Sequence, residues 1–360
     1  MKLVLLGTGT SHGIPVIGCG CKVCRSSDPR NNRFRASALL LADIPGNCSD
    51  FNNPTGSVAG GFKEIVKWNK LVAQQKGTSF AEPMLVEECR NLSDKDKEML
   101  CKTNILVDAG PEFRIQAIKS GIKKLDAVLL THSHADHLHG LDDLRIFSSS
   151  KPPKRMIPEE DIETKTLEIY ANSNTLADIT SRFDYAFKPT QEGGGKPKFN
   201  ILPTENFSLE NPLVVNNIQI VPVPILHGHL QDNGYAFIEE LDGKKHCILY
   251  LTDCSSIPES SYSLIHKIAK VCQSGSISHL VIDALREKSH TTHFNFEQAL
   301  EAAEIIKPVN TWFTHICHVH SHQEIQSYID ENLQKYPGLW EIKKTGGTIQ
   351  PAYDFMEISC

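Results

Sequence analysis

The residues best able to do chemistry lie in one short stretch, Thr131 to Gly140, with the sequence THSHADHLHG. The stretch follows an apolar run that ends at Leu130. Imidazole and carboxylate groups are good ligands for zinc, manganese and iron. Four such side chains stand close together here: His132, His134, Asp136 and His137. A His-rich turn can also be a solvated loop, but four potential ligands at one predicted strand end favour a dedicated metal site.

The spacing of these side chains predicts two ions rather than one. Alternate residues of an extended segment share a face, so His132 and His134 can reach one ion. Asp136 and His137 lie beyond the turn and point toward a second. Two ions a few ångströms apart can share a hydroxide and stabilise both the attacking and the leaving oxygen. The expected chemistry is hydrolysis.

Other acidic and histidine residues follow strand-like apolar runs. ILVD ends at Asp108, IVPVPIL leads to His227, CILYLTD ends at Asp253, and TWFTH ends at His315. Folds that combine helices with parallel strands place functional groups at the strand ends. We therefore expect these residues to converge on the His-rich stretch.

This order of motifs resembles that of the metallo-β-lactamase superfamily. The resemblance implies an α/β fold, the αββα sandwich, in which two mixed β-sheets are flanked by helices. Asp108 matches the aspartate that supports the metal loop, although a turn or N-cap aspartate before Gly110 is an equally open interpretation. The implied metal ligands are His132, His134 and His227 for the first ion, Asp136, His137 and His315 for the second, and Asp253 as a bridge between them.

A second cluster is formed by Cys19, Cys21 and Cys24 in the run GCGCKVC. These thiols are too close in sequence for a sensible disulfide framework, and a structural zinc needs four ligands. His318 is the candidate for the fourth ligand, because it lies three residues beyond His315 and a turn could direct it to the other side. The alternative is a loop of reduced cysteines.

Longer motifs narrow the resemblance. They are LLGTGTSHGIPVIGCGCKVC, THSHADHLHGLDDLR, LTDCSSIPE, and TTHFNFEQAL followed by FTHICH. Together they resemble the PhnP-like phosphoribosyl cyclic phosphodiesterases of phosphonate degradation. That family implies one structural Zn²⁺ on the three cysteines and His318, beside two divalent ions, Mn²⁺ or Zn²⁺, in the active site. It also implies hydrolysis of a small, cyclic phosphodiester by a hydroxide that bridges the metals.

One histidine outside the ligand set is a catalytic candidate. His293 precedes a predicted helix over Phe296 to Ile306, for which Asn295 is the expected N-cap. The resemblance implies that His293 protonates or hydrogen-bonds the leaving oxygen. His290 is a weaker competitor, and a polar loop histidine without a catalytic role is the alternative for both.

Arg145 is a candidate for contact with the substrate phosphate. It lies in the helix expected after the metal loop and matches an arginine of the phosphodiesterase pattern. An ordinary ion pair with Asp142, three residues earlier, explains it equally well. We therefore keep Arg145, with Asp108, as a possible substrate-binding or supporting residue.

Two other functions remain open. Endonucleases that process the 3′ end of tRNA share the opening LGTG and the metal residues, but they use a basic arm to hold RNA, for which KPPKR is the candidate here. The Cys loop is not part of their usual pattern. A non-catalytic metal-binding module is the second alternative, although such a protein has little physical reason to keep seven ligands on one pocket.

Composition sets broad limits on location and partners. A net charge of -6 argues mildly against binding long nucleic acid. The expected partner, a small phosphodiester, is the one that the family resemblance implies. Eleven cysteines and the lack of a secretory signal indicate a reducing compartment, the cytoplasm. No apolar run is long enough to span a bilayer, so no membrane contact is expected. Relatives in the superfamily suggest a homodimer.

The chain is expected to form a single hydrolase domain over residues 1–360 with two additions. The first is an insertion at about 44–102, between the runs SALLLAD and ILVDAG, in which Phe62 to Gln75 has helical spacing. The second is a variable polar loop at about 148–166. The Gly-rich run that starts at Gly193 predicts a hairpin or linker.

Overall fold

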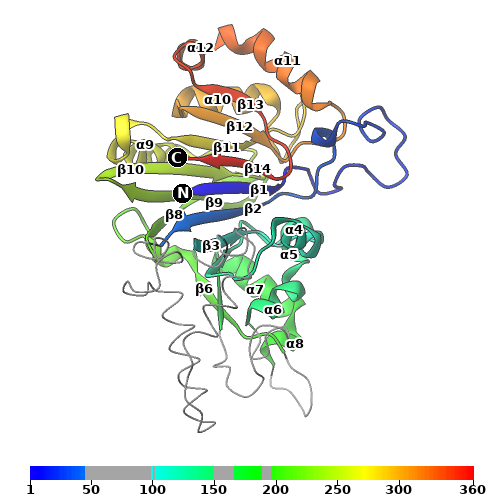
Figure 1. Ribbon diagram of the computed structural model, residues 1–360, viewed down its shortest axis with the longest axis vertical. Helices are drawn as coiled ribbons and strands as arrows, with labels where there is room; N and C mark the ends of the chain where they lie inside the picture. Colours follow the sequence, from blue (N-terminus) through cyan, green and yellow to red (C-terminus); the bar gives the residue numbers. More distant parts are fainter. Residues whose placement is uncertain (45–98, 100–101, 149–165, 189–195) are drawn as a thin grey trace, which may run out of the picture.

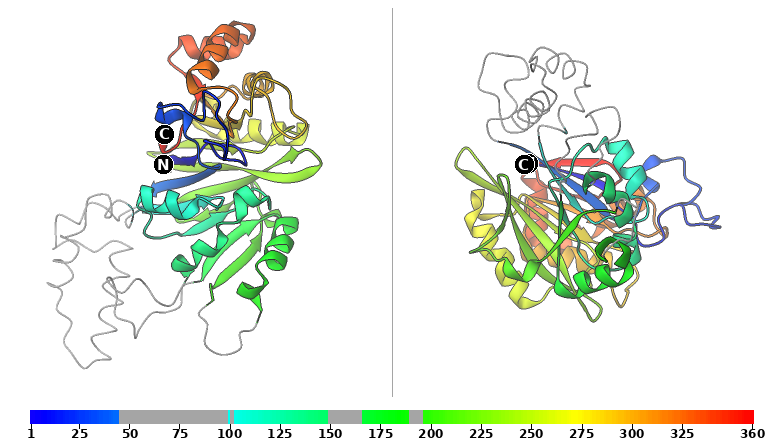
Figure 2. Two further views of the ribbon diagram at one scale, coloured as in Figure 1. Left: turned by 90° about the vertical axis from the view of Figure 1, so that its right-hand side faces the viewer. Right: turned by 90° about the horizontal axis from the view of Figure 1, so that it is seen from below.

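Two β-sheets face each other and carry helices on their outer sides (Figures 1 and 2). This arrangement is seen in a computed structural model that describes residues 1–44, 99, 102–148, 166–188 and 196–360. The αββα sandwich predicted from the order of the motifs is confirmed.

The first sheet has the strand order β14-β1-β2-β3-β4-β5-β6. Its strands are β1 Lys2–Gly7, β2 Ser37–Asp43, β3 Lys102–Val107, β4 Ala127–Leu129, β5 Leu167–Ala171, β6 Phe199–Pro203 and β14 Met356–Ser359. Strands β1 to β4 are buried along almost their whole length. Burial on both faces explains why they are near-continuous apolar runs rather than alternating ones.

The second sheet has the order β13-β12-β11-β10-β9-β8-β7. Its strands are β7 Leu213–Val215, β8 Ile218–His227, β9 Leu230–Leu241, β10 Lys244–Leu251, β11 His279–Asp283, β12 Asn310–Thr314 and β13 Thr348–Pro351. β10, β11 and β12 are parallel, and β9 is antiparallel to both β8 and β10. β8, β10, β11 and β12 therefore all end at the same edge of this sheet.

Helices cover the outer face of each sheet (Figure 1). On the first sheet these are α4 Phe113–Ser120, α5 Ala135–Leu138, α6 Arg145–Ser148, α7 Ser173–Arg182 and α8 Asp184–Phe187. On the second they are α9 Glu259–Val271, α10 Phe296–Ile306, α11 His322–Asn332 and α12 Pro337–Lys344. The short 3-10 turns are η1 Pro29–Asn31, η2 Leu141–Leu144, η3 Thr204–Asn206, η4 Gln273–Gly275 and η5 Leu333–Lys335.

The apolar core has three layers. The central layer lies between the sheets, where Leu5 and Leu40 of the first sheet share a cluster with Tyr235 and Phe237 of the second. The outer layers lie between each sheet and its helices. The layered core fixes the two sheets against each other, so side chains at their common edge are held by a rigid frame.

The strands on either side of the predicted insertion are neighbours. β2 and β3 pair in antiparallel register, with Leu39 opposite Leu106. The chain therefore leaves the sheet after β2 and re-enters it beside the same strand. The predicted helix over Phe62 to Gln75, residues 149–165 of the polar loop, and the Gly-rich run at Gly193 lie outside the described residues.

Candidate metal centre

Three histidines from different elements meet at the strand ends. His132 and His134 follow β4, and His227 is the last residue of β8. The ring centroids of His132 and His134 are 4.6 Å apart, and those of His134 and His227 are 5.0 Å apart. One ring nitrogen from each can lie within 4.8 Å of the others. These are the three residues predicted to hold the first ion.

The residues predicted for the second ion form a neighbouring group: Asp136, His137, Asp253 and His315. Asp253 lies between two histidines, with its Oδ2 3.0 Å from His137 Nε2 and its Oδ1 3.2 Å from His315 Nε2. Asp136 Oδ2 lies 3.3 Å from His137 Nε2. Asp253 also belongs to a compact group with His227 and therefore reaches toward the first set.

The donor atoms in both groups fit divalent metal ions. The Nε2 atoms of His132, His137 and His315 are buried and have no hydrogen-bond partner within the described part of the chain. A buried polar atom without a partner is costly, and a cation that prefers nitrogen and oxygen ligands satisfies these atoms together. The seven residues thus suit two ions, and their assignment as ligands remains a prediction.

The protonation of the histidines depends on their surroundings. Burial lowers the pKa of His227 to about 4 and that of His132 well below its usual value, so both rings are neutral, as metal ligands must be. Burial also opposes charge on His137, but Asp253, Asp136 and Asp108 together raise its pKa well above the usual value. The negative charge around His137 is what a bound cation would neutralise.

Asp108 lies behind the metal site. It follows β3 and is fully buried. Its Oδ2 lies 2.7 Å from His137 Nδ1, and its Oδ1 accepts a hydrogen bond of 2.8 Å from the Thr131 backbone N–H. A carboxylate that accepts the Nδ1 proton fixes the ring and leaves Nε2 for a metal. This geometry suits the supporting role implied for Asp108 rather than direct metal binding.

Two buried aspartates were not predicted. Asp283 is the last residue of β11, and its Oδ2 accepts hydrogen bonds of 2.8 Å from His293 Nδ1 and from the Cys254 backbone N–H. The run HLVID is an apolar run that ends in an aspartate, like the runs before Asp108 and Asp253, so the sequence could have identified Asp283 as a site residue. Asp232 Oδ2 lies 3.4 Å from His132 Nδ1, and burial raises the pKa of Asp232 to about 8. Asp232 has polar neighbours in β9 and does not follow an apolar run, so the sequence pattern did not indicate it.

His293 lies against the metal site, outside the predicted ligand set. Its ring centroid is 4.6 Å from those of both His227 and His315. Asn295 forms a capping box with Gln298 at the start of α10, so the predicted helix and its cap are confirmed. The hydrogen bond from Nδ1 to Asp283 leaves Nε2 as the ring atom available to a substrate.

Arg145 is the first residue of α6, and its Nη1 lies 3.6 Å from Asp142 Oδ2. Its side chain is 42% exposed. The geometry matches the ion pair that the spacing suggested. A contact with substrate phosphate remains a prediction.

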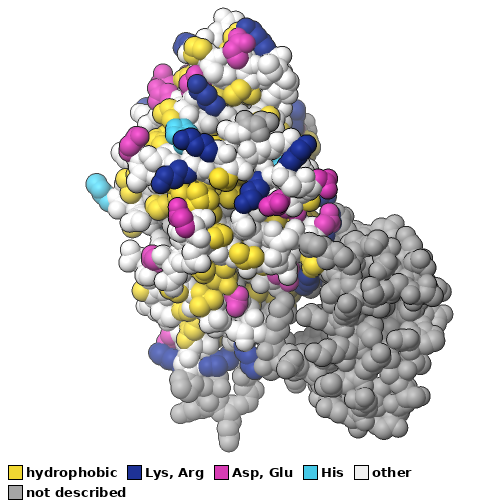
Figure 3. Space-filling model, turned by 90° about the vertical axis from the view of Figure 1, so that its left-hand side faces the viewer, with side chains coloured by type: hydrophobic (Ala, Val, Ile, Leu, Met, Phe, Trp, Pro, Cys, Tyr) yellow, Lys and Arg dark blue, Asp and Glu magenta, His cyan; other side chains and the backbone are white. Residues whose placement is uncertain are grey.

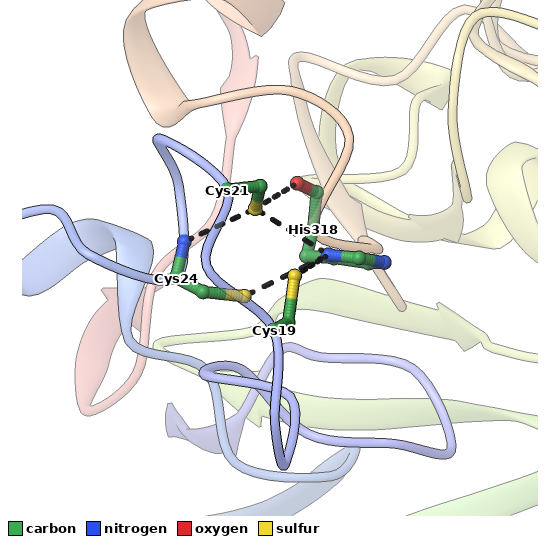
Figure 4. A group of neighbouring side chains, drawn as sticks. All are labelled: Cys19, Cys21, Cys24 and His318. Carbon is green, nitrogen blue, oxygen red and sulfur yellow. Dashed lines mark hydrogen bonds between the residues drawn. The ribbon is translucent and has the colours of Figure 1, made fainter.

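The predicted zinc residues also come together (Figure 4). The Sγ atoms of Cys19, Cys21 and Cys24 lie 3.4, 3.5 and 3.6 Å from His318 Nδ1. Tetrahedral zinc with its usual bonds to sulfur and nitrogen separates these ligand atoms by about 3.6 Å. A backbone N–H and the His318 ring lower the pKa of Cys21 to about 6, which favours the thiolate. The geometry fits a closed structural zinc site, and the ion itself remains a prediction.

Known proteins share this fold. The family model described as "Beta-lactamase superfamily domain" matches residues 103–316. An octanoyltransferase from Porphyromonas gingivalis (strain ATCC BAA-308 / W83) is 29% identical over 343 residues, which cover 94% of this chain and 51% of that protein. The chain therefore spans about half the length of this curated relative.

Solved structures of other proteins also have this fold. A diphosphatase of the PhnP family is 27% identical, with a TM-score of 0.63 and coverage of 100% of this chain and 97% of that one. Zinc-bound PqqB from Methylobacterium extorquens is 15% identical, with a TM-score of 0.57 and full coverage of both chains. The short form of human tRNase Z is 16% identical, with a TM-score of 0.51 and coverage of 100% and 99%. The last two show the fold alone. None of the described helices is long and apolar enough to cross a membrane.

Proposed function

Because the chain belongs to the β-lactamase superfamily, we propose that its metal centre hydrolyses a small, cyclic phosphodiester. One observation carries the proposal. Seven predicted ligands lie in two adjacent groups, and Asp253 of the second group also has a carboxylate oxygen within 4.8 Å of a ring nitrogen of His227 in the first. Such a pair of sites is suited to in-line displacement at phosphorus. The PhnP-family diphosphatase supports phosphorus as the reacting centre.

The residues divide into binding and proton-transfer groups. His132, His134 and His227 would hold one ion, Asp136, His137 and His315 the other, with Asp253 between them. Zinc or manganese ions held there would lower the pKa of a water molecule and neutralise the phosphate oxygens. The departing oxygen of the broken P–O bond needs a proton. We assign this proton to Nε2 of the protonated His293 ring, whose Nδ1 is hydrogen-bonded to Asp283.

The cluster of three cysteines and one histidine has a structural role in this proposal. Cys19, Cys21, Cys24 and His318 would hold one zinc ion with no open position. Such an ion does no hydrolysis, but it fixes the N-terminal loop beside the strand that carries His315. We retain the cytoplasm as the proposed location and a homodimer as the proposed assembly, on the sequence arguments given above.

The experiment is a hydrolysis assay on purified protein loaded with manganese or, separately, zinc. The substrates are bis(p-nitrophenyl) phosphate and a panel of 2′,3′-, 3′,5′- and ribose cyclic phosphates. Asp253→Ala should lower turnover by at least about a thousandfold, because both ions lose a ligand, while the metal at the cysteine site stays bound. Asp330→Ala, on the exposed side of α11, is the matched control. Undiminished turnover in Asp253→Ala would overturn the proposal.

Two further substrates test the alternatives. Precursor tRNA tests 3′-end processing. The face of the protein in Figure 3 mixes acidic and basic side chains around apolar ones, and its described residues form no continuous basic stripe. An octanoyl thioester tests acyl chemistry, the alternative that the curated relative raises. Cleavage of either substrate, with no phosphodiester activity, would replace the present proposal.

A further inference from the structure

A charged residue outside the predicted ligand sets is fully buried. Arg33 lies in the segment that leads into β2, and the residue is 1% exposed. Burial lowers its pKa to about 10, so the guanidinium still carries its charge at neutral pH. Removing a guanidinium from water is costly unless hydrogen bonds inside the protein replace those to water. The partners of Arg33 therefore indicate what the buried group does.

The guanidinium of Arg33 spans the turn that carries His318. Nη1 donates to the Cys317 carbonyl over 2.8 Å, and Nη2 donates to the His320 carbonyl over 3.3 Å. These carbonyls stand on either side of His318, one residue before it and two residues after it. A planar group with donors in a fixed fork can hold two acceptors at a set separation. Arg33 therefore fixes the backbone that carries the predicted fourth zinc ligand.

Asn31 adds to this contact. Its Oδ1 accepts hydrogen bonds of 3.3 Å from Arg33 Nη2 and of 2.7 Å from the His322 backbone N–H. Asn31 is itself buried, and its Nδ2 donates to Ser26 Oγ over 2.9 Å. The segment before β2 thus holds the turn over residues 317–322 at both of its ends.

The backbone of Arg33 contacts the base of the cysteine loop. Arg33 and Ile14 exchange two backbone hydrogen bonds, of 2.7 and 2.8 Å. The loop continues from Ile14 to Val16, whose N–H donates to Cys24 Sγ over 3.4 Å. A Cβ atom placed on Gly9 would come within 2.9 Å of Arg33 Cβ, so the backbone here has little room to shift. Arg33 thus joins the segment that supplies the cysteines to the segment that supplies the histidine.

The cysteine–histidine site, formed by Cys19, Cys21, Cys24 and His318, needs such a link because its ligands come from two separate parts of the chain (Figure 4). Residues that orient the ligands contribute strongly to metal affinity. Charge favours the same residue. Zn²⁺ with three thiolates and a neutral imidazole has one net negative charge, and the guanidinium brings one positive charge to the adjacent backbone.

We propose that Arg33 is a positioning residue of the cysteine–histidine site, which holds the cysteine loop and the His318 turn at the separation that a metal ion requires. The inference rests on the structural zinc of the proposed function and adds a residue that is not itself a ligand. Arg33 takes no part in hydrolysis. Its effect is on how long the cysteine–histidine site keeps its metal.

Cobalt provides the test, because Co²⁺ bound by thiolates absorbs light through thiolate-to-metal charge transfer, whereas the hydrolytic centre offers only nitrogen and oxygen ligands. The full chain is loaded with Co²⁺ and mixed with excess EDTA. Decay of the charge-transfer absorption measures release from the cysteine–histidine site alone. Elemental analysis of the desalted protein at the same times measures total cobalt, and the difference gives release from the hydrolytic centre.

Two variants at one position separate the contributions of the guanidinium. Arg33→Met removes every donor, so release from the cysteine–histidine site should be about 10- to 100-fold faster. Arg33→Lys keeps the charge, but its single nitrogen cannot match both carbonyls, so release should be about 3- to 10-fold faster. The matched control is Arg30→Met, three residues earlier, because the Arg30 side chain is 45% exposed and pairs with Asp28. Release in this control should equal that of the wild type.

Wild-type release in Arg33→Lys would overturn the positioning role, and this variant decides alone if Arg33→Met does not fold. Equal acceleration at the cysteine–histidine site and the hydrolytic centre would also overturn it, because that result shows a general loosening of the fold. A wild type without thiolate-to-cobalt absorption would overturn the zinc site and the role of Arg33 with it. None of these measurements depends on turnover, so they stay separate from the test of phosphodiester hydrolysis.

Discussion

Three residues of the site occupy backbone conformations that side chains rarely adopt. Asp108, Asp253 and His315 have φ angles of 60°, 51° and 57°. The left-handed region costs a non-glycine residue on the order of 1–2 kcal/mol. Each residue comes just after a buried strand, so the unusual turn directs its side chain across the strand ends. The rigid sandwich holds these turns in place because the strands before them are fixed in the core.

A first prediction concerns the support that Asp108 gives to His137. Asp108→Ala leaves the Thr131 backbone N–H and His137 Nδ1 buried without their acceptor. We expect stability to fall by roughly 1–3 kcal/mol and metal affinity by about 10- to 100-fold. Urea unfolding of the metal-free protein and competition with a chelator measure the two effects.

Asp330→Ala serves as the control for this change, because it removes a carboxylate from an exposed helical position. This control variant should alter neither the free energy of unfolding nor the metal affinity. Metal affinity that stays at the wild-type value in Asp108→Ala would show that His137 keeps its orientation without Asp108.

At the scale of elements, strand ends were the predictable part of the site. An apolar run followed by Asp or His located Asp108, Asp253 and His315, because buried strands must end where polar groups begin. The same rule could have identified Asp283. Asp232 could not be found this way, since its approach to His132 depends on how β9 is placed beside the metal loop. The contact between Cys19 and His318 joins residues 299 positions apart and was accessible only through a motif.

Two similar helix caps allow a matched comparison. Asn295 caps α10 and Ser321 caps α11, and both form complete capping boxes. Asn295→Ala and Ser321→Ala should each lower stability by about 1 kcal/mol. Only Asn295→Ala should also lower turnover, by a few-fold, because Asn295 lies two residues after His293.

Thermal unfolding and turnover on bis(p-nitrophenyl) phosphate distinguish the two caps. If both variants lose the same stability and the same turnover, the start of α10 has no special part in placing His293.

At the scale of the whole molecule, distant parts of the chain meet at Asp354. Its Oδ1 accepts hydrogen bonds from the Thr8 backbone N–H and hydroxyl, and its Oδ2 accepts one from the Phe34 backbone N–H. The same segment leads into β14, which pairs with β1. Burial of the carboxyl group raises its pKa to about 7.

This raised pKa predicts how stability depends on pH. A carboxyl with a folded pKa above its unfolded value of about 3.9 binds its proton more tightly in the folded state. Its stabilising contribution is therefore complete below about pH 4 and is lost as pH rises through 7. The stability of the wild type relative to Asp354→Asn should be greater at pH 5 than at pH 8. Urea unfolding of both metal-loaded proteins measures it, and a difference that grows toward pH 8 would contradict the buried, protonated carboxyl.

The cysteine site joins the two ends of the fold, since the loop that carries Cys19, Cys21 and Cys24 contacts His318 near the C-terminal helices (Figures 1 and 4). Cys24→Ser replaces a thiolate with a poor zinc ligand, so we expect the metal content to fall from three ions to two.

Loss of this long-range link should lower Tm by about 5 °C or more. Turnover should fall as well, because His315 lies three residues before His318. Elemental analysis and calorimetry measure these effects, and Cys360→Ser, outside the cluster, is the control. Three ions retained in Cys24→Ser would show that the cysteine cluster is not a zinc site, and two ions with unchanged turnover would show that it does not hold His315 in place.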